Sequence, residues 1–385
     1  MPFKQADLVS CEKQTSIKKM LTFFLDYLFL AILGVVLTIV VATPILKSTN
    51  VYKNSYNEME VTSVECYKIQ CDAKLSIKKD ETSIFNESEL FDEYVNSHIL
   101  LSYSYNTDQY NNASINIDDT SKKASFDNDY IGYYYSQFKL DKSIKAQDYN
   151  GKTGKEYFIS LIKNGNGNNF FEYHENELPS IKAEVGIDLY NYKNGAKSSS
   201  YYSSFKEFFL DLNRKALIEL AEYEPYKVQY DKYINAYERI CKAQNRTLII
   251  VYSSLIMTML VLPKVISGNG LTLGALITKT RTRYDKNKIL SLVVDNVLTY
   301  IIMFSAVGFI GLISYGIASL SVKLFYNITL LTFILVALII LMADFVVTSF
   351  VPKNITLIEL ASFETMVDVH KSIKDEEIIN EKDQA

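Results

Sequence analysis

The sequence predicts an all-α membrane protein with four transmembrane helices and a large, mainly helical extracytoplasmic domain inserted between the first and the second. Three observations lead to this fold class. Four apolar runs are each long enough to cross the hydrocarbon core of a bilayer, which is about 30 Å thick. A polar block, residues 47–246, separates the first run from the other three. Charged residues, turn residues or proline bound every run.

The first run, residues 18–46, carries one charge within its apolar part, at Asp26. An ionised Asp inside a membrane helix costs on the order of 2.5–3.5 kcal/mol, so it needs a partner, a proton or a function. The run is longer than the apolar region of a cleaved signal peptide. We therefore expect it to remain as a signal anchor behind a polar lead, residues 1–17.

The other predicted spans are residues 247–266, 289–322 and 325–351. The loop between the second and third, residues 267–288, is rich in Lys and Arg and contains a single acid, Asp285. By the positive-inside rule this loop is cytoplasmic. Four spans then place both termini, including a tail over residues 352–385, in the cytoplasm. The prediction is a multi-pass protein of the plasma membrane.

The insertion is harder to interpret. Its excess of acidic residues gives no reason to expect nucleic acid as a partner. Apolar spacing predicts helices over 87–101, 130–140 and 155–162. The clearest pattern is an apolar face from Phe205 to Ala221, which predicts a helix packed on the rest of the domain and ended by Pro225.

Two cysteines of the insertion, Cys66 and Cys71, are separated by four residues. They can close a small disulfide or act as unpaired apolar thiols, and the spacing does not decide between these alternatives. No Cys and His spacing typical of zinc is present. The chain has three histidines and no pattern of a known enzyme class, so we expect no catalytic residues, no bound metal and no cofactor.

Three carboxylates lie within predicted spans: Asp26, Asp295 and Asp344. At 1.5 Å per residue each is on the order of 10–14 Å from the cytoplasmic interface. One shared polar site costs less than three separate charges in lipid, and such a site could exchange protons or cations. The alternative is that each carboxylate pairs with a nearby Lys or reaches the headgroups.

Two stretches near the first two spans resemble the RDD family of bacterial membrane proteins. Lys18 and Lys19, eight and seven positions before Asp26, are similar to the family's basic opening, where Arg is usual. The stretch 270–274 resembles the family's GxTLG turn through its residues Gly270, Thr272 and Gly274. Ala275 stands where the family usually has Lys.

A third stretch, residues 354–362 followed by 366–368, resembles the family's closing TLHDxLAGT pattern. Glu359 stands where the second Asp of that pattern belongs. The resemblance covers residues 18–46 and about 247–368, and leaves the insertion unexplained. It implies transport of a small solute or cation. The Lys and Glu replacements keep the charges but not the bidentate geometry of an Arg with a carboxylate.

Two functions follow as hypotheses. In the first, carboxylates in the inner half of the membrane handle a cation or small solute. Four spans are few for a transport path, so this hypothesis also implies a homo-oligomer. In the second, the protein is a membrane-anchored binding or scaffold protein whose extracytoplasmic domain holds a protein partner without transport. The first predicts that Asp26, Asp295 and Asp344 face one cavity, and the second predicts that they lie apart.

Overall fold

The computed structural model describes residues 8, 11–96, 130–144, 154–173, 179–193, 195–284, 287–325, 328–350 and 355–369. The predicted helix end at 97–101 and the predicted tail beyond 369 lie outside these residues, as do the three histidines. The chain forms two compact units. We call residues 1–56 with 237–385 the bundle unit, and residues 57–236 the insert unit.

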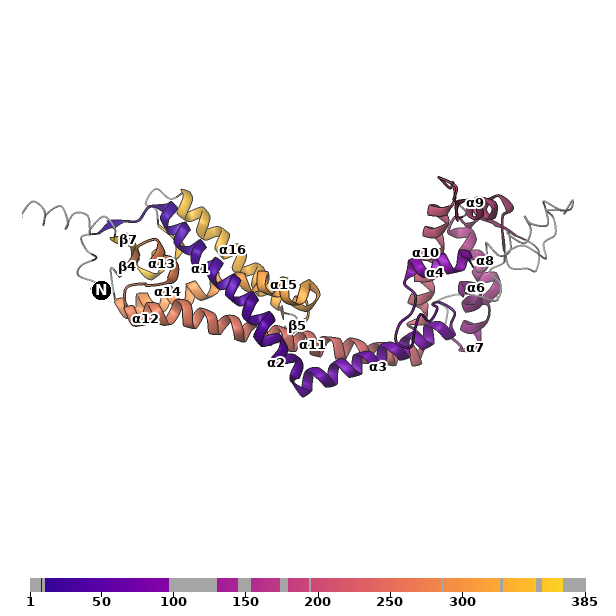
Figure 1. The fold of residues 1–385 in the computed structure, drawn as a ribbon, viewed down its shortest axis with the longest axis horizontal. Coiled ribbons are helices and arrows are strands. Elements are labelled where there is room, and N and C mark those ends of the chain that lie inside the picture. Colours follow the sequence, from indigo (N-terminus) through magenta and orange to yellow (C-terminus); the bar gives the residue numbers. More distant parts are fainter. Residues whose placement is uncertain are drawn as a thin grey trace, which may run out of the picture. The chain divides into compact units, whose positions relative to one another are not determined.

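Long helices build the bundle unit (Figure 1). They are α1 (Ser16–Leu37), α2 (Thr43–Ser48), α11 (Glu224–Ile256), α12 (Leu262–Ser267), α14 (Lys288–Met303), α15 (Ser305–Leu320) and α16 (Leu330–Phe350). Within the described residues, four helical stretches are long and apolar enough to cross a membrane: Ser16–Ser48, Glu224–Ser267, Lys288–Leu320 and Leu330–Phe350. The prediction of a mostly helical chain with four candidate spans is confirmed.

Two of these stretches contain a π-helical turn directly before a proline. The turn η1 (Thr38–Ala42) joins α1 to α2 ahead of Pro44, and η6 (Met257–Val261) joins α11 to α12 ahead of Pro263. A proline ring clashes with the carbonyl four residues earlier and lacks an N–H, and a wider turn relieves both problems. The helices therefore continue past their prolines.

The third stretch is interrupted, and the fourth begins later than the apolar run does. Gly316 leaves the helical conformation, with φ of 80° and ψ of 166°. The strands β5 (Lys323–Phe325) and β6 (Ile328–Thr329) form an antiparallel hairpin pair. The helix α16 starts only after this hairpin, at Leu330 rather than at residue 325.

A continuous apolar core holds these helices together. It includes Leu30, Tyr252, Ile256, Val307 and Leu330. Large apolar side chains also remain exposed along the helices, among them Ile32 at 56% and Ile339 at 67%. Exposed apolar surface on this scale is typical of a face that contacts lipid.

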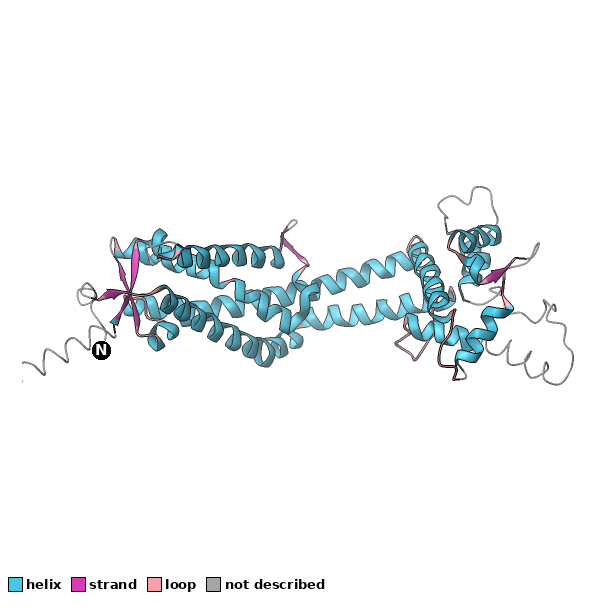
Figure 2. Ribbon diagram, turned by 90° about the horizontal axis from the view of Figure 1, so that it is seen from above, coloured by secondary structure: helices cyan, strands magenta, loops and turns pink. Residues whose placement is uncertain are grey.

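A three-stranded antiparallel sheet closes one end of the bundle unit (Figure 2). Its order is β1 (Glu12–Lys13), β7 (Glu364–Asp368), β4 (Thr280–Tyr284). Two short helices, α13 (Leu273–Ile277) and α17 (Leu357–Ser362), lie at the same end. The sheet is a departure from the all-α prediction.

The insert unit is helical with one short hairpin. Besides parts of α11 and of α3 (Asn50–Asp72), its elements are α4 (Glu87–Tyr94), α6 (Tyr130–Tyr133), η4 (Tyr134–Phe138), α7 (Lys139–Asp141), α8 (Gly154–Asn164), η5 (Gly167–Asn169), β2 (Phe171–Glu172), β3 (Ser180–Ile181), α9 (Ala183–Lys193) and α10 (Tyr202–Leu220). Its core is aromatic: the rings of Phe91 and Phe209 are 5.5 Å apart, and those of Tyr94 and Phe209 4.8 Å.

The apolar face predicted from residue 205 onward packs into this core. Phe205, Phe209 and Ala216 are fully buried on α10. The next helix, α11, begins at Glu224, and Pro225 occupies its first turn, where a missing N–H costs nothing. The predicted packed helix is confirmed, but it ends at Leu220, and Pro225 belongs to the start of the next helix instead of ending this one.

Cys66 and Cys71 are separate thiols in the structure. Both lie on the continuous helix α3. At 100° per residue their side chains point about 140° apart around the helix axis, which is incompatible with the Cβ geometry of a disulfide. Of the two alternatives left open by the sequence, the structure has the unpaired thiols.

Candidate functional site

Buried charged side chains gather at the sheet end of the bundle unit, and seven of them form one group. We call them the charged cluster: Lys19, Asp26, Lys264, Asp295, Asp344, Glu359 and Glu364. None is more than 8% exposed. They come from α1, α12, α14, α16, α17 and β7. With two lysines and five carboxylates, the charged cluster has more acids than cations, so hydrogen bonds or protons must stabilise the rest.

Asp26 caps the short helix α13. The Thr272 hydroxyl donates to Oδ2 of Asp26 at 2.6 Å, and the Gly274 N–H donates to Oδ1 at 2.7 Å. Thr272 is itself the N-cap residue and accepts a hydrogen bond from the Ala275 N–H at 3.1 Å. Asp26 is thus held by a hydroxyl and an amide and has no cation in direct contact.

Position 274 has no room for a side chain, so only glycine fits there. A Cβ at Gly274 would lie 2.2 Å from the Thr22 carbonyl oxygen and 2.9 Å from Cγ of Asp26. Real Cβ atoms do not approach backbone oxygens so closely. Gly270 has a related role, because its φ is +69° and a Cβ there would meet the Thr282 side chain on β4. The two glycines of the GxTLG-like stretch therefore allow α13 to pack closely against α1 and β4.

Asp295 forms an ion pair with Lys264. The ammonium donates to Oδ1 at 2.8 Å and to Oδ2 at 3.0 Å, and also to the Thr299 hydroxyl at 3.1 Å. Thr299 in turn donates to Oδ1 of Asp295 at 3.1 Å. The pair joins the end of α12 to the first turns of α14, and all its charged atoms have polar partners.

Glu359 and Lys19 form a second buried ion pair, with Nζ 2.6 Å from both carboxylate oxygens. Glu359 also completes a capping box at the start of α17, where it accepts the Thr356 N–H at 2.8 Å. It accepts the Met366 N–H of β7 at 2.7 Å as well. One carboxylate therefore ties α1, α17 and β7 together.

Asp344 is engaged at the same end. Its Oδ1 accepts the Leu357 N–H at 2.7 Å, one of the otherwise unsatisfied donors in the first turn of α17. Next to this group, Lys18 forms an ion pair with Asp368 of β7. Both contacts fasten α17 and β7 to the ends of long helices.

The structure thus brings the predicted site residues to one end of the bundle unit but gives each a different partner. Asp26 binds α13, Asp295 binds Lys264, and Asp344 binds α17. The residues of the RDD-like stretches contact one another: Lys19 meets Glu359, and Asp26 meets Thr272 and Gly274. Each of the three predicted carboxylates therefore has its own hydrogen-bond or ion-pair partner.

Sequence reasoning missed Lys264 and Glu364. Lys264 is a single cation after Pro263 inside an apolar run, and such a residue is a signal for a partner carboxylate in another span. Glu364 carried no such signal, because a strand of five residues gives little periodicity. One of its oxygens, Oε2, is buried and has no hydrogen-bond partner among the described residues. Burial and the nearby Asp295 carboxylate raise the pKa of Glu364 to about 8.

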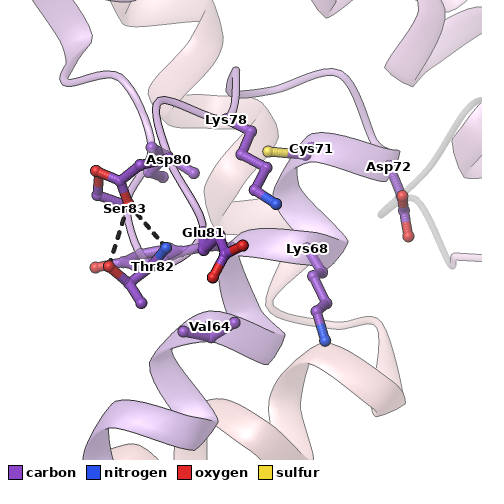
Figure 3. A pocket seen from close by; sticks show the side chains of 11 residues that line it. Val64, Lys68, Cys71, Asp72, Lys78, Asp80, Glu81, Thr82 and Ser83 are labelled. Carbon is purple, nitrogen blue, oxygen red and sulfur yellow. Dashed lines mark hydrogen bonds between the residues drawn. The ribbon is translucent and has the colours of Figure 1, made fainter.

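A second candidate site is a hollow on the insert unit, with a volume of about 200 Å³ (Figure 3). One wall is α3, with Lys68, Cys71 and Asp72, and the other is the loop 78–84. Asp80 shapes this loop by accepting the Thr82 N–H at 2.8 Å and the Ser83 hydroxyl at 2.5 Å. These hydrogen bonds, first that of Ser83, lower the pKa of Asp80 to about 2. The lining carries charges of both signs.

Comparisons with protein-family models, with curated proteins and with solved structures find no match for this chain. Among the described residues, no group of three or more His, Cys, Asp or Glu side chains is arranged to hold a metal ion.

Proposed function

We propose that the protein is a membrane-anchored binding or scaffold protein of the RDD type, whose insert unit is extracytoplasmic and holds a protein partner. The observation that carries this proposal is the separate engagement of Asp26, Asp295 and Asp344. Each fastens a structural element, which supports a structural role for the three carboxylates. The hollow on the insert unit offers charged side chains, among them Lys68, Lys78 and Glu81, for recognition.

The charged cluster has a structural role in this proposal. It connects the ends of four long helices to the sheet β1-β7-β4 and fixes the arrangement of the spans. The meeting of the three RDD-like stretches in this cluster supports the family assignment. Lys18, Lys19 and Glu359 keep the ionic contacts that the family pattern implies, with an ammonium in place of a guanidinium.

The second candidate function is transport of a cation or small solute, with the protein as a homo-oligomer. It is favoured by the concentration of five buried carboxylates at the sheet end of the bundle unit. Cation-dependent proton flux in proteoliposomes distinguishes the scaffold function from transport. The flux of the wild type is compared with that of Asp26→Asn. The matched control is Asp211→Asn, an exposed carboxylate on α10. Flux abolished only by Asp26→Asn, with folding intact, overturns the scaffold proposal.

The binding role has its own test. A photo-crosslinking amino acid at Glu81, on the rim of the hollow, is introduced into the full chain in its native membrane. The control places the same amino acid at Lys215, on the exposed face of α10. A discrete adduct from position 81 that is missing from position 215 supports partner binding at the hollow. Identical adducts from both positions, or none from either, contradict it.

A further inference from the structure

The carboxylates of the charged cluster can be accounted for one at a time. Two are paired with cations, Glu359 with Lys19 and Asp295 with Lys264. Two are held by hydrogen-bond donors from short helices: Asp26 at α13 and Asp344 at α17. Glu364 is the fifth, and neither lysine of the charged cluster forms an ion pair with it.

Lys264 does not supply that missing cation contact. An ammonium has three N–H groups, and three oxygens already surround Nζ: both carboxylate oxygens of Asp295 and the Thr299 hydroxyl. Lys264 acts on Glu364 only at longer range, as an attractive charge. Ionised Glu364 would therefore be a buried negative charge without a cation in direct contact, which is strongly unfavourable.

Several elements face the Glu364 carboxyl. From α14 comes Asp295 and from α17 come Glu359 and the Ser362 hydroxyl, of which only the hydroxyl favours the ionised form by hydrogen bonding. From β4 comes Tyr284, which stands directly opposite Glu364 in the antiparallel register. Burial and the Asp295 and Glu364 carboxylates raise the pKa of Tyr284 well above its ordinary value, so its phenol stays neutral.

We propose that Glu364 is a proton-binding site, and that its proton controls how firmly the start of the strand β7 is held beside the Lys264 and Asp295 pair. In the protonated form the carboxyl is neutral and is accommodated beside the Lys264 and Asp295 pair. Loss of the proton leaves a buried charge that is repelled by Asp295 and Glu359. The start of β7 then opens more readily, because opening gives the carboxylate access to water.

The pH range in which the start of β7 opens more readily follows from the raised pKa of Glu364. The pKa of Glu364, about 8, lies above the ordinary value of 4.5. Between these two values the closed strand keeps a proton that the open strand releases. Opening therefore becomes about tenfold easier for each pH unit between about pH 6 and 8 and levels off above that range.

The first test uses infrared difference spectra of the full chain in lipid nanodiscs, because a protonated carboxylic acid has a C=O stretch that a carboxylate lacks. The variants are Glu364→Gln, which imitates the neutral acid, and the control Glu12→Gln, an exposed acid on the same sheet. We expect an acid band in the wild type that disappears with a midpoint near pH 8. It should persist in Glu12→Gln and be missing from Glu364→Gln. A wild type without this titration, or an unchanged titration in Glu364→Gln, overturns the proposal.

A second measurement needs only the wild type. Hydrogen exchange of the β7 amides, Glu364–Asp368, is compared with that of α10 in the same molecule, so that the direct effect of hydroxide cancels. We expect the ratio to rise about a hundredfold between pH 6 and 8 and then to level off. A ratio that is independent of pH overturns the proposal. Because neither measurement involves a partner or transport, failure here is distinct from failure of the proposed function.

Discussion

Lys19 and Glu359 meet at 2.6 Å although 340 positions separate them in the sequence. Both side chains are 2% exposed. Since Glu359 also caps α17 and accepts an N–H of β7, this ion pair joins the first long helix to the last elements of the described chain. It is the contact through which the first and third RDD-like stretches meet.

Breaking this pair from either side should destabilise the protein strongly. Lys19→Met leaves Glu359 as a buried charge without its cation, and Glu359→Gln leaves Lys19 in the same state. Each should lower the free energy of unfolding by about 3–5 kcal/mol. The double variant should lose less than the sum, because neither charge is left alone. Reversible unfolding in mixed detergent micelles measures these free energies of unfolding.

The control for this prediction is the exposed pair of Lys68 and Glu65 on α3. Lys68→Met should change the free energy of unfolding by less than about 1 kcal/mol, because exposed ion pairs contribute little. Equal effects of Lys19→Met and Lys68→Met would show that the buried pair has no special role.

Gly274→Ala should separate α13 from α1. Its Cβ would lie 2.2 Å from the Thr22 carbonyl oxygen, and backbone cannot move aside as a side chain can. We expect the free energy of unfolding to fall by about 1–3 kcal/mol. The amide at position 274, which binds Asp26, should also be less protected from hydrogen exchange. Gly165→Ala is the matched control, because the nearest atom there is 3.3 Å away. If both variants lose the same free energy of unfolding, the close contact with Thr22 does not explain why a glycine is needed at position 274.

The spans and the helix after residue 202 could be predicted because each depends on a long apolar pattern in one continuous stretch. The β1-β7-β4 sheet could not, since its strands have two to five residues and pair across most of the chain. The contact of Lys19 with Glu359 was indicated only by the RDD resemblance. Partners such as Lys264 for Asp295 are set by the packing of α12 on α14, which periodicity does not reveal.

Stability should fall as pH rises through the neutral range, and Glu364 should be the cause. A group whose pKa is raised on folding contributes fully below its unfolded value, here 4.5, and loses that contribution as pH approaches its folded value, about 8. The wild type should therefore lose stability between about pH 5 and 8. Glu364→Gln should remove this slope, and Glu12→Gln should keep it. Thermal unfolding in nanodiscs across this pH range is the measurement.

Cys66 and Cys71 should both be found as free thiols after alkylation under non-reducing conditions and mass spectrometry. Cys66 is buried, and burial raises its pKa to about 11, so it should react far more slowly than Cys71. A membrane-impermeant maleimide on intact cells also tests the sidedness of the insert unit, because Cys71 should be labelled from outside. Labelling of Cys71 only after lysis would place the insert unit in the cytoplasm. Recovery of a peptide linked through both cysteines would contradict the helical geometry of α3.

Removing Lys264 and removing Asp295, the two partners of one ion pair, should have different effects on stability. Lys264→Met leaves Asp295 and Glu364 buried together without a cation and should cost about 3–5 kcal/mol. Asp295→Asn leaves Lys264 with Thr299 and with Glu364, which can then act as its counter-charge, so the loss should be smaller. Removing the Asp295 charge should also lower the pKa of Glu364, because that charge is one cause of its raised value. In infrared spectra the Glu364 acid band of Asp295→Asn should accordingly disappear at a lower pH than in the wild type. A midpoint that stays near pH 8 would mean that burial alone sets the affinity of Glu364 for its proton.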